Sequence, residues 1–347
     1  MMLSAIHISD SPGQALNVFL MEKNYSSIVF LTDENTKELC YPLISKHIPK
    51  HQVISIKSGE ENKTIETCSE IWAAMTHQAL DRHSVMVILG GGVLGDMGGF
   101  CAYTFKRGID FILVPTTLLA MADASIGGKL GVDFEGFKNH IGVFQEPELN
   151  LIHSGFLATL PPTELRSGFA EIIKHALISD REMWNALKVR NLTDQPWDKL
   201  LKHSVEFKSS VVAQDPKEKG LRKILNVGHT VGHALETYFL GKDAKILHGE
   251  AIAAGLICEA YLSADQNLLP ESELKEITSY ILQIFGKLEI LETETKTIAG
   301  LTVQDKKNKG NRILAALIDG IGQARVDCEV TLDKIVDSLS FYRSLQI

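Results

Sequence analysis

The chain has 347 residues, of which 45% are hydrophobic and 22% are charged, and its formal net charge is −8 at pH 7. One hydrophobic core rarely serves so long a chain, so we expect two domains, and this composition excludes a disordered protein. The negative charge also argues against a nucleic-acid partner, because binding to phosphate backbones requires an excess of Lys and Arg.

The cysteines and the N-terminal residues bear on the cellular compartment. The five cysteines are scattered and have no CxxC spacing, which argues against a disulfide framework and against a thiolate zinc site. The N-terminus has no basic region followed by a long apolar run, and no uninterrupted apolar stretch approaches about 18 residues. We therefore expect a cytoplasmic protein without a membrane partner.

Short β-branched runs alternate with helical patterns in the first part of the chain. The predicted helices cover residues 35–47 and 64–78, and the predicted strands cover residues 27–31, 52–56, 85–89 and 111–114, the last of which ends at Pro115. Such alternation predicts an α/β fold with a parallel sheet that is covered by helices. We interpret residues 1–155 as a Rossmann-like, NAD-binding domain.

The pattern becomes helical after about residue 155, where Pro147, Gly155 and the pair Pro161-Pro162 interrupt the chain. Helix-length segments with charged residues on one side follow at 162–180, 181–190, 195–214, 228–240, 248–266 and 271–288. We therefore predict a second, mostly α-helical domain over residues 156–347 that binds metal and substrate.

A glycine-rich segment, Gly90 to Asp96, directly follows the strand at 85–89 and precedes a predicted helix over 97–104. Such a turn lets backbone amides and a helix N-terminus face a pyrophosphate group without obstruction by side chains. The segment is not GxGxxG, and a tight strand-to-helix turn without a ligand is the alternative.

Polar residues also follow two earlier strands, at the edge where ligands of open α/β sheets gather. Asp33 and Asn35 come after the first predicted strand, and Glu60 and Lys63 after the second. Asp33 could bind a ribose hydroxyl or cap a helix. For Glu60 and Lys63, the alternative to a nucleotide contact is a solvated pair in a loop.

Residues 107–142 set basic side chains among small residues, with glycines directly beside Arg107 and Lys129. Glycines next to cations predict a backbone that closely approaches an anionic ligand, and phosphate is the ligand that this arrangement favours. A solvated surface position is the alternative for any single lysine, but it does not explain the whole cluster.

A set of potential metal ligands lies in the second half. Glu171 and Lys174 are at i, i+3 on one predicted helix, His229 and His233 are at i, i+4 on another, and His248 begins a third. One carboxylate with two or three imidazoles suits a divalent ion with room for substrate oxygens, and zinc is the ion that these ligands favour.

These residues also have simpler interpretations. Two histidines on one helix face are often surface residues, and Glu250 could cap its helix rather than contact a metal. We expect the isolated histidines to be structural or solvated, namely His7, His77, His140 and His175.

Together these segments resemble the 3-dehydroquinate synthase family over nearly the whole chain, most specifically from Gly90 to Gly142. The resemblance implies an NAD-dependent lyase of the shikimate pathway, with zinc, or cobalt in its place, held by Glu171, His229 and His248. It also implies a homodimer, in which Arg107 acts across the subunit interface.

The resemblance carries further contacts onto this sequence. The implied substrate and catalytic residues are Arg107, Asp123, Lys129, Lys138, Asn139, Lys174, Lys208, Arg222, Asn226, His233 and Lys307. The implied nucleotide contacts are Asp33, Asn35, Glu60, Lys63, Gly91, Gly92, Val93, Asp96, Thr116, Thr117, Lys129 and Lys138. The chain departs from the family pattern without losing any ligand or catalytic group, at Ala124, Asp133, Phe137, Thr163 and Val227, where the family often has Ser, Asn, Gly, Arg and Phe.

The implied reaction converts 3-deoxy-D-arabino-heptulosonate 7-phosphate to 3-dehydroquinate and phosphate. It proceeds by transient oxidation with NAD, β-elimination of phosphate, return of the hydride, ring opening and intramolecular aldol closure. His233 is the candidate proton relay. We expect the phosphate to contact Lys129, Asn139, His233, Lys307 and Arg107, and the carboxylate and hydroxyls to contact Lys138, Lys174, Lys208, Arg222 and Asn226.

Three other functions compete with this one. A metal-containing polyol dehydrogenase would share the layout of domains, but it would not need so many cations. Another sugar-phosphate cyclase is disfavoured by Lys208, Arg222 and Asn226, which suit a substrate carboxylate. A non-catalytic binding protein would have lost a ligand or a catalytic lysine.

Overall fold

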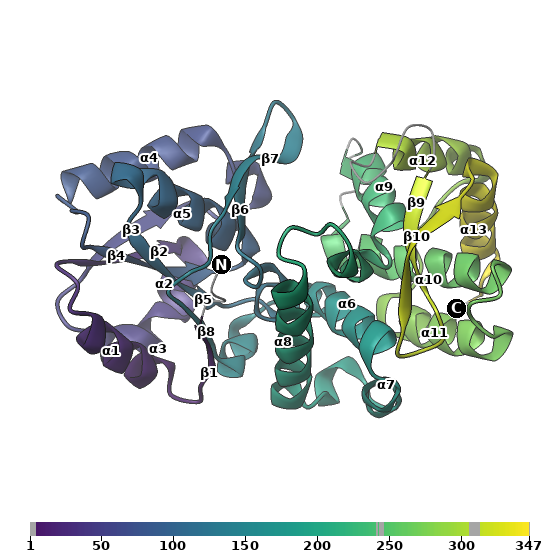
Figure 1. The fold of residues 1–347 in the computed structure, drawn as a ribbon, viewed down its shortest axis with the longest axis horizontal. Coiled ribbons are helices and arrows are strands. Elements are labelled where there is room, and N and C mark those ends of the chain that lie inside the picture. The colour runs from purple at the N-terminus through teal and green to yellow at the C-terminus, as the bar shows by residue number, and fades with distance from the viewer. Residues whose placement is uncertain (1–4, 241, 243–245, 305–312, 347) are drawn as a thin grey trace. The chain divides into compact units, whose positions relative to one another are not determined.

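The structure, a computed structural model, describes residues 5–240, 242, 246–304 and 313–346. The chain divides into two compact units, Met1–Leu165 (unit 1) and Arg166–Ile347 (unit 2). Unit 1 runs from purple to teal in Figure 1, and unit 2 continues from teal to yellow. The predicted division of functions between residues 1–155 and 156–347 stays a prediction.

Unit 1 is built on a six-stranded sheet in the order β1-β8-β5-β4-β2-β3, in which all neighbouring strands are parallel. Its strands are β1 (Ala5–Ile8), β2 (Ile28–Asp33), β3 (Gln52–Ile56), β4 (Val85–Gly90), β5 (Asp110–Pro115) and β8 (Leu149–Ile152). The four predicted strands are confirmed as β2 to β5. The sequence did not reveal β1 and β8, because four residues are too few to show a periodic pattern.

Helices cover both faces of this sheet. The long ones are α1 (Pro12–Lys23), α4 (Ile65–His77) and α5 (Gly92–Thr104), and Figure 1 shows α4 and α5 on one side of the strands and α1 on the other. Apolar side chains of α4 and α5, such as Ile71 and Met97, pack in one core with Leu31 and Ile88 of the sheet. Coverage on both faces explains why β4 is an uninterrupted buried apolar run.

Two helix predictions in unit 1 need correction. The segment predicted as one helix over 35–47 forms α2 (Glu34–Leu39) and α3 (Tyr41–Ser45), because Pro42 has no amide hydrogen to continue the first helix. The helix predicted from Met97 begins at Gly92, so the glycine-rich segment itself supplies its first turn.

Short elements extend the carboxyl edge of the sheet, which is the edge where the parallel strands end. After β5 comes a π-helical turn, η3 (Ala120–Ala124), and then the antiparallel hairpin of β6 (Lys129–Phe134) and β7 (Phe137–Phe144). Strand β6 packs against α5. The sequence did not reveal this hairpin, because polar residues and glycines hide its alternation.

Unit 2 is mostly helical, as predicted. Its helices are α6 (Pro162–Ser179, which begins in unit 1), α7 (Arg181–Leu187), α8 (Trp197–Gln214), α9 (His229–Leu240), α10 (His248–Asp265), α11 (Glu271–Phe285), α12 (Thr295–Leu301) and α13 (Leu332–Ser344). Helix α10 is buried along almost its whole length and packs against α9, α11 and α13. The antiparallel hairpin of β9 (Ile313–Ile318) and β10 (Ala324–Val330) was not predicted.

Among the described residues, no helix combines the length and the apolar character that crossing a bilayer requires.

Candidate active site

The predicted nucleotide residues of unit 1 lie where parallel strands end. Asp33 is the last residue of β2, and Glu60 and Lys63 follow β3. The glycine-rich segment follows β4, and Thr116 and Thr117 follow β5. The chain moves outward from β2 to β3 but in the opposite direction from β4 to β5. Such a reversal of strand order places a ligand-binding crevice at this edge.

The glycine-rich turn leaves room for a ligand at the start of α5. Gly91 is the N-cap of this helix, and no side chain caps its free amides. A Cβ atom at Gly91 would lie only 3.0 Å from Cγ2 of Thr117, and one at Gly92 would lie 3.3 Å from Cβ of Ala124. Gly91, Gly92 and Ala124 line a pocket together with Asp96 and Lys129. Glycines that lack side chains, at the N-terminus of a helix, suit the close approach of a pyrophosphate group.

The helix-cap alternative for Asp33 is confirmed. Its Oδ1 accepts hydrogen bonds from the backbone N–H of Thr36 at 2.7 Å and from the Thr36 hydroxyl at 3.0 Å. Asn35 is in the first turn of α2 and donates to the hydroxyl of Ser58 at 3.1 Å. The cap uses one carboxylate oxygen of Asp33, so a contact with a ribose stays a prediction.

Lys63 is a buried junction rather than a solvated loop residue. It is 4% exposed. Its Nζ donates to Oδ2 of Asp96 at 2.7 Å and to Oδ1 of Asn139 at 2.6 Å. The alternative interpretation, a solvated loop pair of Glu60 and Lys63, is therefore wrong. Glu60 instead forms an exposed ion pair with Lys138 at 3.5 Å. Lys63 thus joins the glycine-rich turn to the β6–β7 hairpin.

Other predicted residues of unit 1 fall into two places. Asp123 is half-buried in η3, and Lys129 is the exposed first residue of β6, both beyond the carboxyl edge. Arg107 is exposed in η2 (Phe105–Arg107), which follows the C-terminal end of α5 and leads into the start of β5. Helix α5 returns the chain to the edge of the sheet where the parallel strands begin. Unit 1 therefore does not bring Arg107 to the other predicted site residues.

Three predicted metal ligands come together in unit 2. Oε1 of Glu171 lies 3.5 Å from Nε2 of His229 and 3.6 Å from Nε2 of His248. These ligand atoms, from α6, α9 and α10, all lie within 4.8 Å of one another. A carboxylate oxygen and two imidazole nitrogens that converge on one point fit a divalent ion such as zinc. Glu171 also forms a buried ion pair with Lys174 through its other oxygen.

Outer contacts orient both imidazoles so that Nε2 faces this point. Nδ1 of His229 donates to the carbonyl oxygen of Val227 at 3.1 Å, and Nδ1 of His248 lies 3.3 Å from Oε2 of Glu236. A hydrogen bond at Nδ1 directs Nε2 toward a metal, and binding of the metal displaces any proton that Nε2 carries. Glu236 was not among the predicted site residues, although it shares a face of α9 with His233 at i, i+3.

Burial and neighbouring charges set the protonation of these ligands. Burial tends to raise the pKa of Glu171, but Lys174 and His229 outweigh it and hold that pKa well below its usual range. Burial, together with the charge of Lys174, lowers the pKa of His229. For His248 burial acts in the same direction, but hydrogen bonds to Glu171 and Glu236 raise its pKa to about 10. The carboxylate of Glu171 is therefore ionised at neutral pH.

The close packing of α9 on α10 fixes the separation of the two histidines. A Cβ atom at Gly255 would come within 2.0 Å of the carbonyl oxygen of Gly228, so only glycine fits. The buried carboxylate of Glu259 on α10 accepts the backbone N–H groups of Gly228 at 2.6 Å and Val231 at 3.0 Å. This carboxylate caps the start of α9 and satisfies amides that the helix cannot pair itself.

His233 lies beside this group, and three further predicted residues of unit 2 lie on α8 and on the segment that follows it. The ring of His233 lies 5.1 Å from that of His229 and 6.1 Å from that of His248. Lys208 is buried on α8, which packs against η6 (Leu221–Asn226). Arg222 and Asn226 both come from η6. Lys307 lies outside the described residues.

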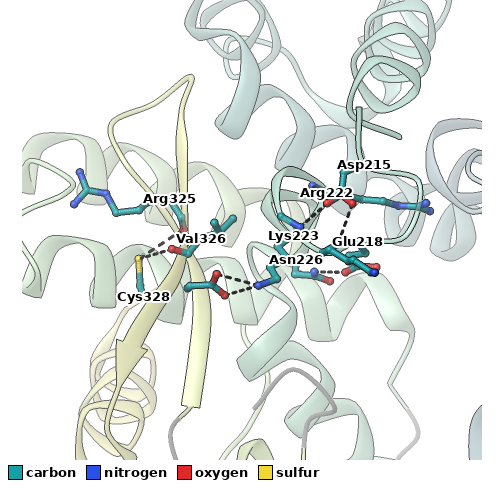
Figure 2. Close-up of polar contacts among 11 residues, drawn as sticks. Asp215, Glu218, Arg222, Lys223, Asn226, Arg325, Val326 and Cys328 are labelled. Atoms are coloured by element: carbon teal, nitrogen blue, oxygen red, sulfur yellow. Dashed lines mark hydrogen bonds and ion pairs between the residues drawn. The ribbon is translucent and has the colours of Figure 1, made fainter. Parts of the chain in front are cut away.

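Figure 2 shows how the loop before η6 is held. The carboxylate of Asp215 accepts backbone N–H groups of three residues, those of Lys219, Gly220 and Arg222. Asn226 donates to Oε1 of Glu218 at 2.6 Å, which brings in a carboxylate that the sequence analysis did not identify. The buried Arg222 side chain donates to a carbonyl oxygen of the same loop, that of Pro216, at 2.8 Å.

An ion pair ties η6 to the β9–β10 hairpin. Nζ of Lys223 lies 2.7 Å and 2.9 Å from the carboxylate oxygens of Asp327. Asp327 has a φ of 54° at an irregularity in the pairing of β10 with β9. The hairpin thus supports the segment that carries Arg222 and Asn226.

Comparisons with known proteins agree with this arrangement. The family model described as 3-dehydroquinate synthase N-terminal matches residues 53–167, and the C-terminal model of the same enzyme matches residues 168–308. The chain is 40% identical to a 3-dehydroquinate synthase of Parabacteroides distasonis over 94% of each chain.

Solved structures extend the comparison. A 2-epi-5-epi-valiolone synthase from Streptomyces hygroscopicus, with NAD+ and Zn2+ bound, is similar with a TM-score of 0.85 at 27% identity over 99% of this chain and 97% of that one. A 2-deoxy-scyllo-inosose synthase complexed with carbaglucose-6-phosphate, NAD+ and Co2+ has a TM-score of 0.84 at 23% identity over 99% of each chain, which shows a shared fold.

Proposed function

The chain belongs to the 3-dehydroquinate synthase family, and we propose that the residues described above carry out the reaction of that family, which converts 3-deoxy-D-arabino-heptulosonate 7-phosphate to 3-dehydroquinate and phosphate. The convergence of Glu171, His229 and His248 is the observation that carries the proposal. The reaction is redox-neutral overall, so NAD serves as a catalytic cofactor rather than a consumed substrate.

Unit 2 holds the metal in this proposal, through Glu171, His229 and His248. A bound zinc or cobalt ion supplies a Lewis acid that lowers the pKa of a coordinated substrate hydroxyl. Lys174 keeps the Glu171 carboxylate ionised through their ion pair. His233 lies beside both histidine ligands and is the group placed to receive the proton of that hydroxyl.

Unit 1 holds NAD at the carboxyl edge of its sheet. When bound there, NAD would supply a hydride acceptor for the substrate. The free amides at Gly91, Gly92 and Val93 face the pyrophosphate, while Asp33 and Thr117 border the site at the ends of β2 and β5. Lys63 and Asp96 are bound to each other, so they shape the site as a pair.

The cations bind the two anionic ends of the substrate. We assign Lys129, Asn139, His233, Lys307 and Arg107 to the phosphate, and Lys138, Lys208, Arg222 and Asn226 to the carboxylate and hydroxyls. Lys174 keeps its predicted place in the second group, with its ammonium group shared with Glu171. Holding both ends restricts the opened chain to one conformer, which favours ring closure by the intramolecular aldol step.

We further propose a cytoplasmic homodimer. Arg107 lies at the edge of the sheet opposite the other predicted residues of unit 1, so a partner subunit could receive it where its own unit does not. The five cysteines are free and buried, which suits a reducing compartment.

The test is phosphate release from the heptulosonate phosphate by the purified protein with zinc and a catalytic amount of NAD+, while the absorbance of NADH is followed in parallel. We expect stoichiometric phosphate without accumulation of NADH, and loss of both phosphate release and bound metal with a chelator. Accumulating NADH with a simple polyol would instead indicate a dehydrogenase. Phosphate release from a different sugar phosphate alone would indicate another cyclase.

A further inference from the structure

The β6–β7 hairpin carries two of the proposed substrate residues, Lys138 and Asn139, opposite a carboxylate to which no role has been assigned. Oδ1 of Asp133 accepts the backbone N–H of Asn139 at 2.7 Å. We propose that Asp133 is a positioning residue that fixes Lys138 and Asn139 in their substrate-binding geometry. This inference rests on the proposed role of those two residues in binding substrate.

The backbone at Asn139 has an unusual conformation that the contact with Asp133 stabilises. Its φ is +49°, in the left-handed region that few residues other than Gly, Asn and Asp adopt. The pairing of β6 with β7 also shifts register between Val132 and Phe134, next to Asp133. A bulge of this kind redirects a side chain away from the regular alternation of a strand. The Asp133 carboxylate pairs the N–H that faces it in this conformation.

The contact continues into the nucleotide side of unit 1. Once Asn139 is turned, its Oδ1 accepts from Nζ of Lys63 at 2.6 Å, and Lys63 also donates to Asp96 at the glycine-rich turn. Asp133 holds the same lysine from the other side, because its backbone N–H donates to the Lys63 carbonyl oxygen at 2.9 Å. Asp133 therefore touches both residues that join the hairpin to α5.

The tip of the hairpin is otherwise exposed. Phe134 and Phe137, which flank the turn, are 42% and 63% exposed. The turn residues Glu135 and Gly136 have φ values of 51° and 77°, which is the pattern of a tight two-residue hairpin turn. Lys138, next to this tip, has an exposed ion pair with Glu60, and the contact of Asp133 with Asn139 fixes the backbone beside it.

The side chain at position 133 must accept a hydrogen bond from the Asn139 amide. This requirement predicts the effect of substitutions there. An Asn side chain at this position offers a carbonyl oxygen of similar reach, whereas Ala offers none. We therefore expect Asp133→Asn to keep the hairpin geometry and Asp133→Ala to lose it.

The experiment compares wild type, Asp133→Ala and Asp133→Asn, with Glu135→Gln as a control that removes a neighbouring exposed charge and leaves the anchor in place. For Asp133→Ala we expect the KM for the heptulosonate phosphate to rise about tenfold, as for loss of one hydrogen bond to a charged group. We expect kcat and Tm to stay close to wild type, and NAD affinity to change less than KM does, because Lys63 and Lys138 are also implied nucleotide contacts. Asp133→Asn and Glu135→Gln should keep a KM within about twofold of wild type, since tenfold corresponds to the lost contact.

Hydrogen exchange at the Asn139 amide gives a readout that does not depend on activity. Exchange should be faster in Asp133→Ala and unchanged in Asp133→Asn. An unchanged KM in Asp133→Ala, or equal impairment of the Ala and Asn variants, would overturn the proposal. So would a loss of Tm and NAD affinity in proportion to KM, because that result would indicate a general structural role. An inactive wild type would instead refute the proposed function, while the exchange data would still test the anchor.

Discussion

The two units build their sites in different ways. In unit 1 the site residues are contiguous segments at strand ends, such as Gly91 to Asp96, and the parallel sheet brings those ends to one edge. In unit 2 the metal ligands lie on three helices, and only the packing of those helices brings Glu171, His229 and His248 together. We therefore expect substitutions that disturb helix packing to weaken the metal site of unit 2, and substitutions at strand ends in unit 1 to act locally on the nucleotide site.

Removing a ligand should have the largest effect and should separate the two units. We expect His229→Ala to lower metal affinity and kcat by more than about 1000-fold, because two protein ligands remain where zinc sites use at least three. Metal analysis and phosphate release measure this effect, and NAD affinity should be unchanged. His77→Ala, at an exposed position on α4, is the control. A metal content equal to wild type in His229→Ala would contradict the assigned ligand set.

The next effect concerns the orientation of a ligand within unit 2. Glu236→Gln weakens the contact at Nδ1 of His248, and we expect metal affinity to fall about 10- to 100-fold, as for other outer contacts of metal ligands. Competition with a chelating dye measures this affinity without reference to turnover. Glu271→Gln, at the exposed start of α11, should leave it unchanged. Unaltered affinity in Glu236→Gln would show that packing alone orients His248.

Helix packing can be tested directly at the contact of α9 with α10. Gly255→Ala places a Cβ atom within 2.0 Å of the carbonyl oxygen of Gly228, and we expect destabilisation of unit 2 by about 1–3 kcal/mol, together with weaker metal binding. Hydrogen exchange should show the loss in unit 2 and little change in unit 1. Gly300→Ala, where nothing lies within 4 Å, is the matched control and should be neutral or slightly stabilising. Equal stability of both variants would mean that α9 and α10 can separate freely.

The smallest of these effects is expected in unit 1, at the glycine-rich turn. Gly91→Ala brings a Cβ atom to 3.0 Å from Thr117, a contact that a small shift can relieve, so we expect NAD affinity to fall about tenfold while the fold persists. Titration of NAD binding measures the affinity, and metal affinity should stay at the wild-type value. A Gly91→Ala variant that binds NAD as tightly as wild type would argue against a close approach of the pyrophosphate to this turn.

Patterns of a few residues in the sequence predicted most of the secondary structure of this protein. The strands β2 to β5, the helical second half and the glycine-rich turn follow from hydrophobic periodicity and from glycine positions. Errors occurred where the pattern was short or interrupted, as at β1 and β8, at the break before Pro42, and at the two hairpins. In those places tertiary contacts, rather than periodicity, decide the conformation.

The sequence by itself determined the fold class, the family and the residue types of the metal site, because these depend on residue identity and on short spacings between residues. Only the tertiary structure decided which groups face one another. It turned Lys63 inward to Asp96 and Asn139 and set Arg107 at the opposite edge of the sheet. It also placed Glu236 beside His248 and Glu259 at the start of α9. The physical reason is that such contacts join residues from separate elements, and their distances depend on close packing that no local pattern encodes.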